Sequence, residues 1–148
     1  MSIRYEYEKA EEEYKKAAKF LTDNGYEFSV TGSMRRKKST IGDIDIIIKA
    51  KESEFDFIVL NYKEIESIVD REKFVVKLKS GIPMQLIFVE ENYKYHLWTS
   101  TGSKKHVKNI KEIYEINRII IEENINSEEE IYRKVGLDYI LPEKREEV

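Results

Sequence analysis

The sequence predicts an α+β fold in two parts: a sheet domain with flanking helices over residues 1–91, and a small, mostly helical subdomain over residues 92–148. Two observations predict it. Before residue 92, apolar residues at spacings of three and four alternate with β-branched runs, which indicates helices between strands. After residue 92 the apolar spacing is almost entirely helical. The chain contains no internal repeat and no low-complexity linker.

The helical spacing, the β-branched runs and the turn residues divide the chain into elements. In chain order they predict a helix over residues 4–21, an extended segment over 26–30, a strand over 41–48, a helix over 55–70, a hairpin from 74–78 and 84–89, a long helix over 107–121 and a short helix over 128–135. Asn24-Gly25 is expected to end the first helix, and Ser127 is expected to cap the last one.

The composition is that of a water-soluble globular protein, with 41% hydrophobic and 37% charged residues. The net charge of −3 excludes a basic coat over the whole chain but not a local basic patch. The absence of cysteine excludes disulfides, thiolate zinc sites and cysteine nucleophiles. The apolar runs are too short to cross a membrane, and the first residues do not fit a signal peptide. We therefore expect a cytoplasmic protein, or an intracellular one of a virus-infected host.

Two acids in a β-branched segment are the first candidates for a reactive site. Asp43 and Asp45 lie two residues apart, and side chains at this spacing point to the same face of a strand. Two carboxylates placed in this way repel each other unless a cation intervenes. Oxygen ligands of this kind suit Mg²⁺, which usually takes one or two protein carboxylates together with phosphate oxygens of a substrate.

A glycine-serine turn followed by basic residues precedes these acids. Gly32 and Ser33 can offer N–H groups and a hydroxyl to a phosphate, and Arg35 and Arg36 add charged donors. By itself, an Asp-x-Asp pair is more often a solvated strand end, a Gly-Ser pair is more often a plain turn, and a basic run is more often an exposed face. The three together within residues 32–45 favour a site for phosphate and metal.

Three blocks of the sequence resemble the family X DNA polymerases, the group of DNA polymerase beta and terminal deoxynucleotidyl transferase within the nucleotidyltransferase superfamily. The blocks are Gly32-Ser33-Met34-Arg35-Arg36 followed by Gly42-Asp43-Ile44-Asp45, then Thr101-Gly102-Ser103-Lys104-Lys105-His106, and then the segment from Glu130 to Arg145. The resemblance implies a nucleotidyltransferase palm, a mixed β-sheet with flanking helices, over residues 1–91 and a thumb-like subdomain over residues 92–148. Since the chain begins at the first palm helix, we expect neither the lyase domain nor the fingers domain of the family.

The resemblance also implies roles for individual residues. Asp43 and Asp45 would be catalytic and hold two Mg²⁺ or Mn²⁺ ions once a nucleotide is bound, and no organic cofactor is expected. Nucleotide-binding residues are expected at Gly32, Ser33, Arg35, Arg36, Gly42, Thr101, Gly102 and Ser103. Contacts to DNA are expected from Lys104, Lys105, His106, Lys108 and Lys111, although a solvated helix face explains this set equally well.

The chain departs from the family pattern at the third acid, which binds the catalytic metal and accepts the proton of the 3′-hydroxyl. The strand that carries this acid aligns with residues 81–87, and the alignment places Gln85 at its position. Glutamine offers an oxygen ligand but no charge, and it cannot act as a base. Thr99-Ser100 replaces the aromatic pair that presses on the sugar, and Val107 replaces an asparagine of the thumb.

We therefore expect a DNA polymerase beta-like nucleotidyltransferase that adds nucleotides from a nucleoside triphosphate to a DNA 3′-end, at a gap or nick, in DNA repair. It is expected to act as a monomer with no membrane partner. One alternative is a catalytically weakened homologue that binds nucleotide and DNA, because Gln85 stands at the third acidic position. The other is a nucleotidyltransferase with a non-DNA acceptor.

Overall fold

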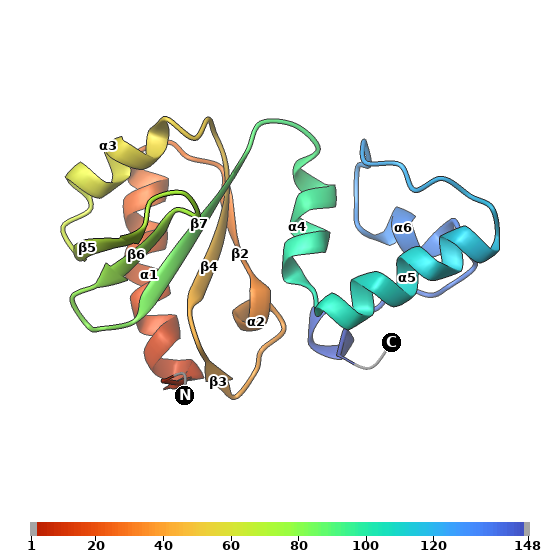
Figure 1. Cartoon of the computed structure of the whole chain (residues 1–148), viewed down its shortest axis with the longest axis horizontal. Helices are drawn as coiled ribbons and strands as arrows, with labels where there is room; N and C mark the ends of the chain where they lie inside the picture. Colours follow the sequence, from red (N-terminus) through yellow and green to blue (C-terminus); the bar gives the residue numbers. More distant parts are fainter. Residues whose placement is uncertain (1–2, 147–148) are drawn as a thin grey trace.

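A computed structural model describes residues 3–146, which form a sheet part and a helical part side by side (Figure 1). The strands are β1 (Tyr5–Glu6), β2 (Phe28–Thr31), β3 (Thr40–Ile41), β4 (Ile44–Lys49), β5 (Ile65–Asp70), β6 (Val75–Leu78) and β7 (Pro83–Val89). The helices are α1 (Tyr7–Asp23), α2 (Gly32–Arg35), α3 (Glu54–Asn61), α4 (Tyr93–Thr101), α5 (Lys104–Ile116), α6 (Glu129–Arg133) and the 3-10 helix η1 (Pro142–Lys144). This arrangement confirms the expected α+β class.

The main sheet is mixed and has the strand order β2-β4-β7-β6-β5. Strands β4 and β7 are parallel, whereas the other neighbouring pairs are antiparallel. The ribbon of β1 and β3 forms a separate two-stranded sheet. The predicted hairpin is present as β6 and β7, and the first helix ends as expected, with Gly25 in the left-handed region at a φ of +80°.

Strand β4 is buried on both faces because four of its six residues are isoleucine. Ile46 and Ile48 belong to the main hydrophobic core, which also takes in Leu21 of α1 and Phe55 of α3. Ile47 is also buried, and the alternation of a strand directs it to the opposite face. Helix α4 packs against β2 and β4. The helical part is therefore anchored to the strand that carries Asp45.

The helical part has a second core of its own. Tyr95 and Trp98 of α4 meet Ile110 and Tyr114 of α5, and Tyr132 of α6 completes the cluster. The two cores are distinct, and the chain passes from one to the other between β7 and α4. The division into domains at residues 91 and 92 stays a prediction.

The helix predicted over residues 55–70 is wrong in its second half. Helix α3 ends at Asn61, and the following residues form β5, an edge strand that pairs with β6. Ile65 and Ile68 pack against the main core, whereas Val69 is 60% exposed. The spacing of these three residues fits a helix, but β-branched residues also suit a strand. One edge of β6 pairs with β7, and the other edge is open to a further strand. These residues form a strand rather than a helix because pairing as β5 satisfies the backbone donors and acceptors along that open edge.

The strand predicted over residues 41–48 is interrupted. Strand β3 ends at Ile41, Gly42 and Asp43 form a bend, and β4 begins at Ile44. Residues 93–101, for which the sequence predicted no element, form α4. Its apolar residues follow no simple stripe because one side contacts the sheet and the other contacts the second core.

The two later helices also differ from their predicted bounds. Helix α5 begins at Lys104, where the Ser103 hydroxyl caps it, and it ends at Ile116 rather than residue 121. The Ser127 side chain does not cap α6. Instead, the Glu130 carboxylate accepts hydrogen bonds from the backbone N–H groups of Asn126 and Ser127, which is the glutamate half of a capping box.

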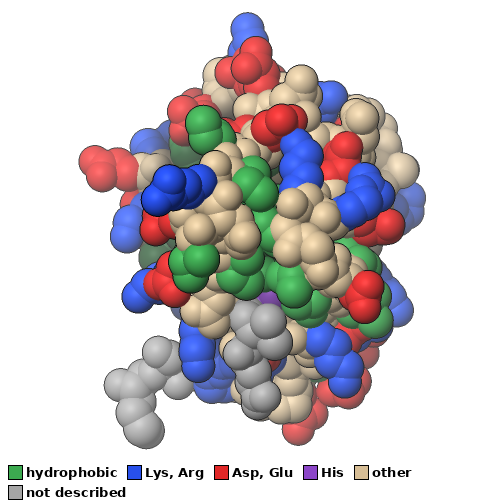
Figure 2. All heavy atoms as spheres, turned by 90° about the vertical axis from the view of Figure 1, so that its right-hand side faces the viewer, with side chains coloured by type: hydrophobic (Ala, Val, Ile, Leu, Met, Phe, Trp, Pro, Cys, Tyr) green, Lys and Arg blue, Asp and Glu red, His purple; other side chains and the backbone are tan. Residues whose placement is uncertain are grey.

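The free end of the helical part carries exposed apolar side chains. Ile116 and Ile120 are 79% and 87% exposed. Figure 2 shows hydrophobic side chains gathered on this face, with charged side chains around them. Among residues 3–146, no helix has the length and apolar character that crossing a bilayer requires.

Candidate active site

A cavity of about 480 Å³ lies where the sheet part meets the helical part. We call it the Asp45 cavity. Its walls come from α2, from β4 and β7, and from the turn between α4 and α5. The structure gathers these residues around it: Gly32, Ser33, Arg36, Asp45, Gln85, Ile87, Thr99, Ser100, Gly102, Ser103 and Lys104. Residues from the first two resembling blocks and from the strand that carries Gln85 therefore share one cavity, whereas the third block does not line it.

Gly32 and Asp45 are in very close contact at the base of this cavity. Gly32 has a φ of +61°, in the left-handed region that favours glycine. A Cβ atom at this position would lie 2.2 Å from Oδ2 of Asp45. The glycine is therefore needed for two reasons: its backbone conformation, and the space that the carboxylate occupies.

The Asp45 carboxyl lies in an environment that disfavours its negative charge. It is largely buried, and its Oδ1 has no hydrogen-bond partner. Burial, aided by the charge of Asp43 and opposed by that of Arg36, raises the pKa of Asp45 to about 7. An unpartnered buried carboxylate oxygen is costly unless a cation is bound to it. This atom therefore fits a divalent metal ion.

Asp43 lies in the bend before β4 rather than within the strand. It lines an adjacent cavity of about 600 Å³, the Asp43 cavity, together with Arg4, Tyr5 and Gly42. Burial raises the pKa of Asp43, and Arg4 opposes this shift. The charge of Asp43 also raises the pKa of Asp45, although the two acids line different cavities. Asp43 therefore precedes β4 and Asp45 lies within it, so the two acids do not share one strand face as predicted, and their role as a metal-binding pair stays a prediction.

Gln85 lies directly beside Asp45, because the two residues are register partners in the parallel pair of β4 and β7. Its Nε2 donates a hydrogen bond to the Lys73 carbonyl at 3.1 Å. Within residues 3–146, no group of three His, Cys, Asp or Glu side chains is placed to hold a metal. The site therefore offers two carboxylates and one neutral amide.

The two predicted phosphate-binding arginines have different positions. Arg36 lines the Asp45 cavity. Its Nε donates to Oε1 of Glu146 at 2.7 Å, and its second donor bonds the Thr101 carbonyl. Arg35 instead forms a paired hydrogen bond to Glu128 and a further one of 2.8 Å to the Thr101 hydroxyl. Arg35 is therefore a structural residue, and its expected nucleotide contact is not supported.

Gly102 and Ser103 form part of the helical wall of the Asp45 cavity, whereas Thr101 is not among its lining residues. The Thr101 hydroxyl is fully buried and bonds the Leu97 carbonyl at 2.6 Å, so this residue braces the turn from inside. Gly102 has a φ of +72° and approaches Arg36, and the Gly102–Ser103 peptide bond is cis. Gly42 does not line this cavity but lies against Arg4 in the Asp43 cavity.

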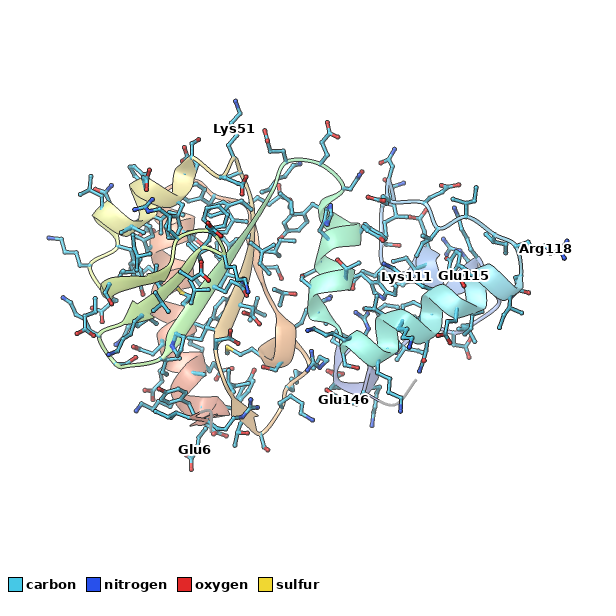
Figure 3. The ribbon with its side chains drawn as sticks, in the orientation of Figure 1. Glu6, Lys51, Lys111, Glu115, Arg118 and Glu146 are labelled. Atoms are coloured by element: carbon cyan, nitrogen blue, oxygen red, sulfur yellow. The ribbon has the colours of Figure 1, made fainter. Side chains whose placement is uncertain are left out.

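Lysines of α5 form a groove of about 450 Å³ with Thr99 and Val107. Lys104, Lys108 and Lys111 line this α5 groove, and Glu112 and Glu115 lie at its far end. Figure 3 shows Lys111 and Glu115 on α5. Thr99 and Lys104 also line the Asp45 cavity, so the two hollows adjoin. Lys105 is exposed but lies outside the groove.

His106 is a core residue, and the expectation that it contacts DNA is wrong. Its side chain is fully buried, and Nε2 shares a hydrogen bond of 2.8 Å with the Tyr132 hydroxyl. Burial, aided by the charge of Arg145, lowers the pKa of His106 to about 4. A neutral, enclosed imidazole cannot reach a nucleic-acid phosphate. The helical period of α5 turns it inward while Lys104 and Lys108 face out.

Four residues around the site make contacts that the sequence did not predict. Arg4 lies beside Asp43, and donates to the Thr40 hydroxyl and carbonyl at 3.2 and 2.7 Å. Glu128 is buried between Arg35 and Arg145. Glu146 contacts Arg36. Of Arg4, Glu128, Arg145 and Glu146, only Arg145 lies in a block of the family resemblance.

The mixed sheet, the glycine-serine turn and the paired carboxylates at the start of β4 define the class: a palm of the nucleotidyltransferase type. A comparison with protein families matches residues 3–139 to the family described as the DNA polymerase beta palm. The chain therefore belongs to the DNA polymerase beta palm family. A comparison with curated proteins gives no match.

Proposed function

We propose that this protein is a family X polymerase-like nucleotidyltransferase, which transfers a nucleotide from a nucleoside triphosphate to a DNA 3′-end. One observation carries the proposal: Asp45, whose Oδ1 has no hydrogen-bond partner, lines a cavity that Ser33 and Arg36 also line. An acid that needs a cation and two groups that bind phosphate are what phosphoryl transfer requires.

Asp43 and Asp45 would hold divalent metal, as Mg²⁺ or Mn²⁺, and the family resemblance implies two ions with nucleotide bound. The fit rests on the free Oδ1 of Asp45 and on the raised pKa of both acids, since a bound cation favours their ionised forms. When bound, such ions offset charge on the phosphates and activate the attacking hydroxyl.

The protein groups around the cavity would bind and orient the triphosphate. Ser33 offers a hydroxyl at the turn where Gly32 leaves space, and Arg36 supplies a charged donor held in place by the Thr101 carbonyl. Gly102 and Ser103 form the opposite wall. Fixed donors of this kind stabilise developing charge without reorganising during the reaction.

The α5 groove is the proposed path of the DNA acceptor. Lys104, Lys108 and Lys111 line it, and it adjoins the Asp45 cavity at Lys104. Contacts between lysine side chains and phosphates strengthen DNA binding in a salt-dependent manner and without sequence preference. A gapped or nicked substrate, a role in repair, a monomeric state and a cytoplasmic location all remain predictions.

Gln85 favours a second candidate function, a homologue that binds nucleotide and DNA but turns over slowly. A neutral amide beside Asp45 cannot accept the proton of the attacking hydroxyl. Under this alternative, nucleoside triphosphate binds with metal but the primer is not extended.

Primer extension separates these possibilities. Gapped, nicked and single-stranded primers are incubated with nucleoside triphosphates and either Mg²⁺ or Mn²⁺, and Asp45→Asn serves as the inactive control. Extension by the wild type supports the proposal, while its absence with every primer and both metals refutes it. If only Gln85→Asp extends the primer, the weakened homologue is the correct function. Competition by RNA or small-molecule acceptors tests for a non-DNA acceptor.

A further inference from the structure

Glu146, the last described residue of the chain, contacts Arg36, which lines the Asp45 cavity. Figure 3 shows Glu146 beside the start of α5, where the helical part meets the sheet part. Oε1 of Glu146 accepts from Nε of Arg36 at 2.7 Å and lies 3.7 Å from Nζ of Lys38. The hydrogen bond to Arg36 lowers the pKa of Glu146, although partial burial opposes this. A carboxylate therefore neutralises the one arginine that lines the cavity.

Glu146 is delivered to this position by an anchored neighbour. Arg145 is fully buried, and its side chain bonds Glu128 at 2.8 Å and the Ile140 carbonyl at 2.9 Å. The Arg145 carbonyl accepts from the hydroxyl of Ser103, which itself lines the Asp45 cavity. Glu146 is thus tethered one residue from a fixed point on the cavity wall, and its effective concentration at Arg36 is high.

The contact between Glu146 and Arg36 is nevertheless easily broken. The Glu146 side chain is 35% exposed, and ion pairs that solvent reaches contribute little free energy. A triphosphate carries several negative charges and would meet Arg36 from the cavity side. The two anions cannot share the guanidinium without mutual repulsion, so a bound triphosphate and a bound Glu146 exclude each other at least in part.

We propose that Glu146 is a built-in competitor that pairs with the Arg36 guanidinium and neutralises its charge until a polyphosphate displaces it. This inference rests on the proposed function, because it takes Arg36 as a phosphate ligand. The C-terminal segment is then an autoinhibitory contact whose strength sets the apparent affinity for the polyphosphate. A competitor that occupies the site between about half and five-sixths of the time weakens binding about two- to sixfold.

The test measures the binding of inorganic triphosphate with Mg²⁺ by titration calorimetry, using the full chain at low salt. This probe has no nucleoside and cannot be transferred to DNA. The variant Glu146→Gln removes the competing charge. Glu143→Gln is the matched control, because Glu143 lies in the same segment, loses the same charge, and faces Lys37 at 4.0 Å rather than a residue of the cavity. Arg36→Ala reports whether the phosphate site itself is correct.

The expected result is that Glu146→Gln binds the triphosphate about two- to sixfold more tightly than the wild type, while Glu143→Gln stays at the wild-type value and Arg36→Ala loses most binding. Unchanged or weaker binding by Glu146→Gln, with binding still dependent on Arg36, overturns the competitor and leaves the proposed function standing. Binding that does not depend on Arg36, or no binding by the wild type, refutes the proposed phosphate site and the inference together.

Discussion

Replacing Gly32 by alanine is expected to damage both the fold and the carboxylate site. The backbone φ of +61° costs an L-residue about 1–2 kcal/mol. The new methyl group would also lie 2.2 Å from Oδ2 of Asp45, so the carboxylate or the turn must move. Overpacking of this kind costs about 1–3 kcal/mol more. We therefore expect the free energy of unfolding to fall by about 2–5 kcal/mol, a large part of the stability of a small protein.

Urea unfolding followed by circular dichroism measures this loss, and Mn²⁺ titration measures the damage to the site. Gly25→Ala is the matched control, because Gly25 has a φ of +80° but no atom within 4 Å of its would-be Cβ. It should cost only the backbone share, about 1–2 kcal/mol, and leave Mn²⁺ binding unchanged. Equal losses of stability in the two variants, or normal Mn²⁺ binding by Gly32→Ala, would show that the close contact with Asp45 has no energetic importance.

Three further predictions concern the charged groups. Asp45→Asn should raise the melting temperature at pH 8 without metal. The reason is that burial raises the pKa of Asp45 from 3.8 to about 7, so the folded state loses stability as the pH rises between these two values. An unchanged melting temperature would contradict this prediction. Glu128→Gln should cost about 3–5 kcal/mol in urea unfolding, because it leaves Arg35 and Arg145 without their carboxylate. Burial pushes the pKa of Glu128 up, but both arginines hold it below 4.5, so the wild-type fold keeps this stability above pH 4.5 and loses it in more acidic solution. Lys108→Ala should weaken DNA binding and reduce its salt slope by about one in a fluorescence titration; an equal effect of Lys105→Ala, outside the α5 groove, would argue against that path.

Local patterns in the sequence were sufficient to predict which residues lie at the centre of the candidate site. The glycine-serine turn, the acids at the start of β4 and the hairpin of β6 and β7 all lie within short segments whose spacing can be read directly. The family resemblance placed Gln85 at the position of the third acid, and the structure puts it in register with Asp45. Arg36, Gly102 and Ser103 followed from the motifs, and all three line the Asp45 cavity.

Neighbouring residues of the same type have different roles because their contact partners lie far away along the chain. Arg35 and Arg36 are adjacent, yet Arg35 is held by Glu128, 93 residues away, and Arg36 by Glu146, 110 residues away. His106 looked like part of a basic run, but the helical rotation of α5 directs it to Tyr132. No spacing in the sequence reports such contacts, because each depends on how α5 and α6 pack.

By itself the sequence determined the α+β class, the family resemblance and the residues proposed for the phosphate and metal chemistry, because these depend on short motifs and local periodicity. Only the tertiary structure decided that residues 65–70 pair as β5, that α4 attaches the helical part to the sheet, that Arg35 pairs with Glu128, and that His106 is buried. It also brought Glu146 onto Arg36. These outcomes depend on long-range pairing, burial and charge partners, which exist only after the chain has folded.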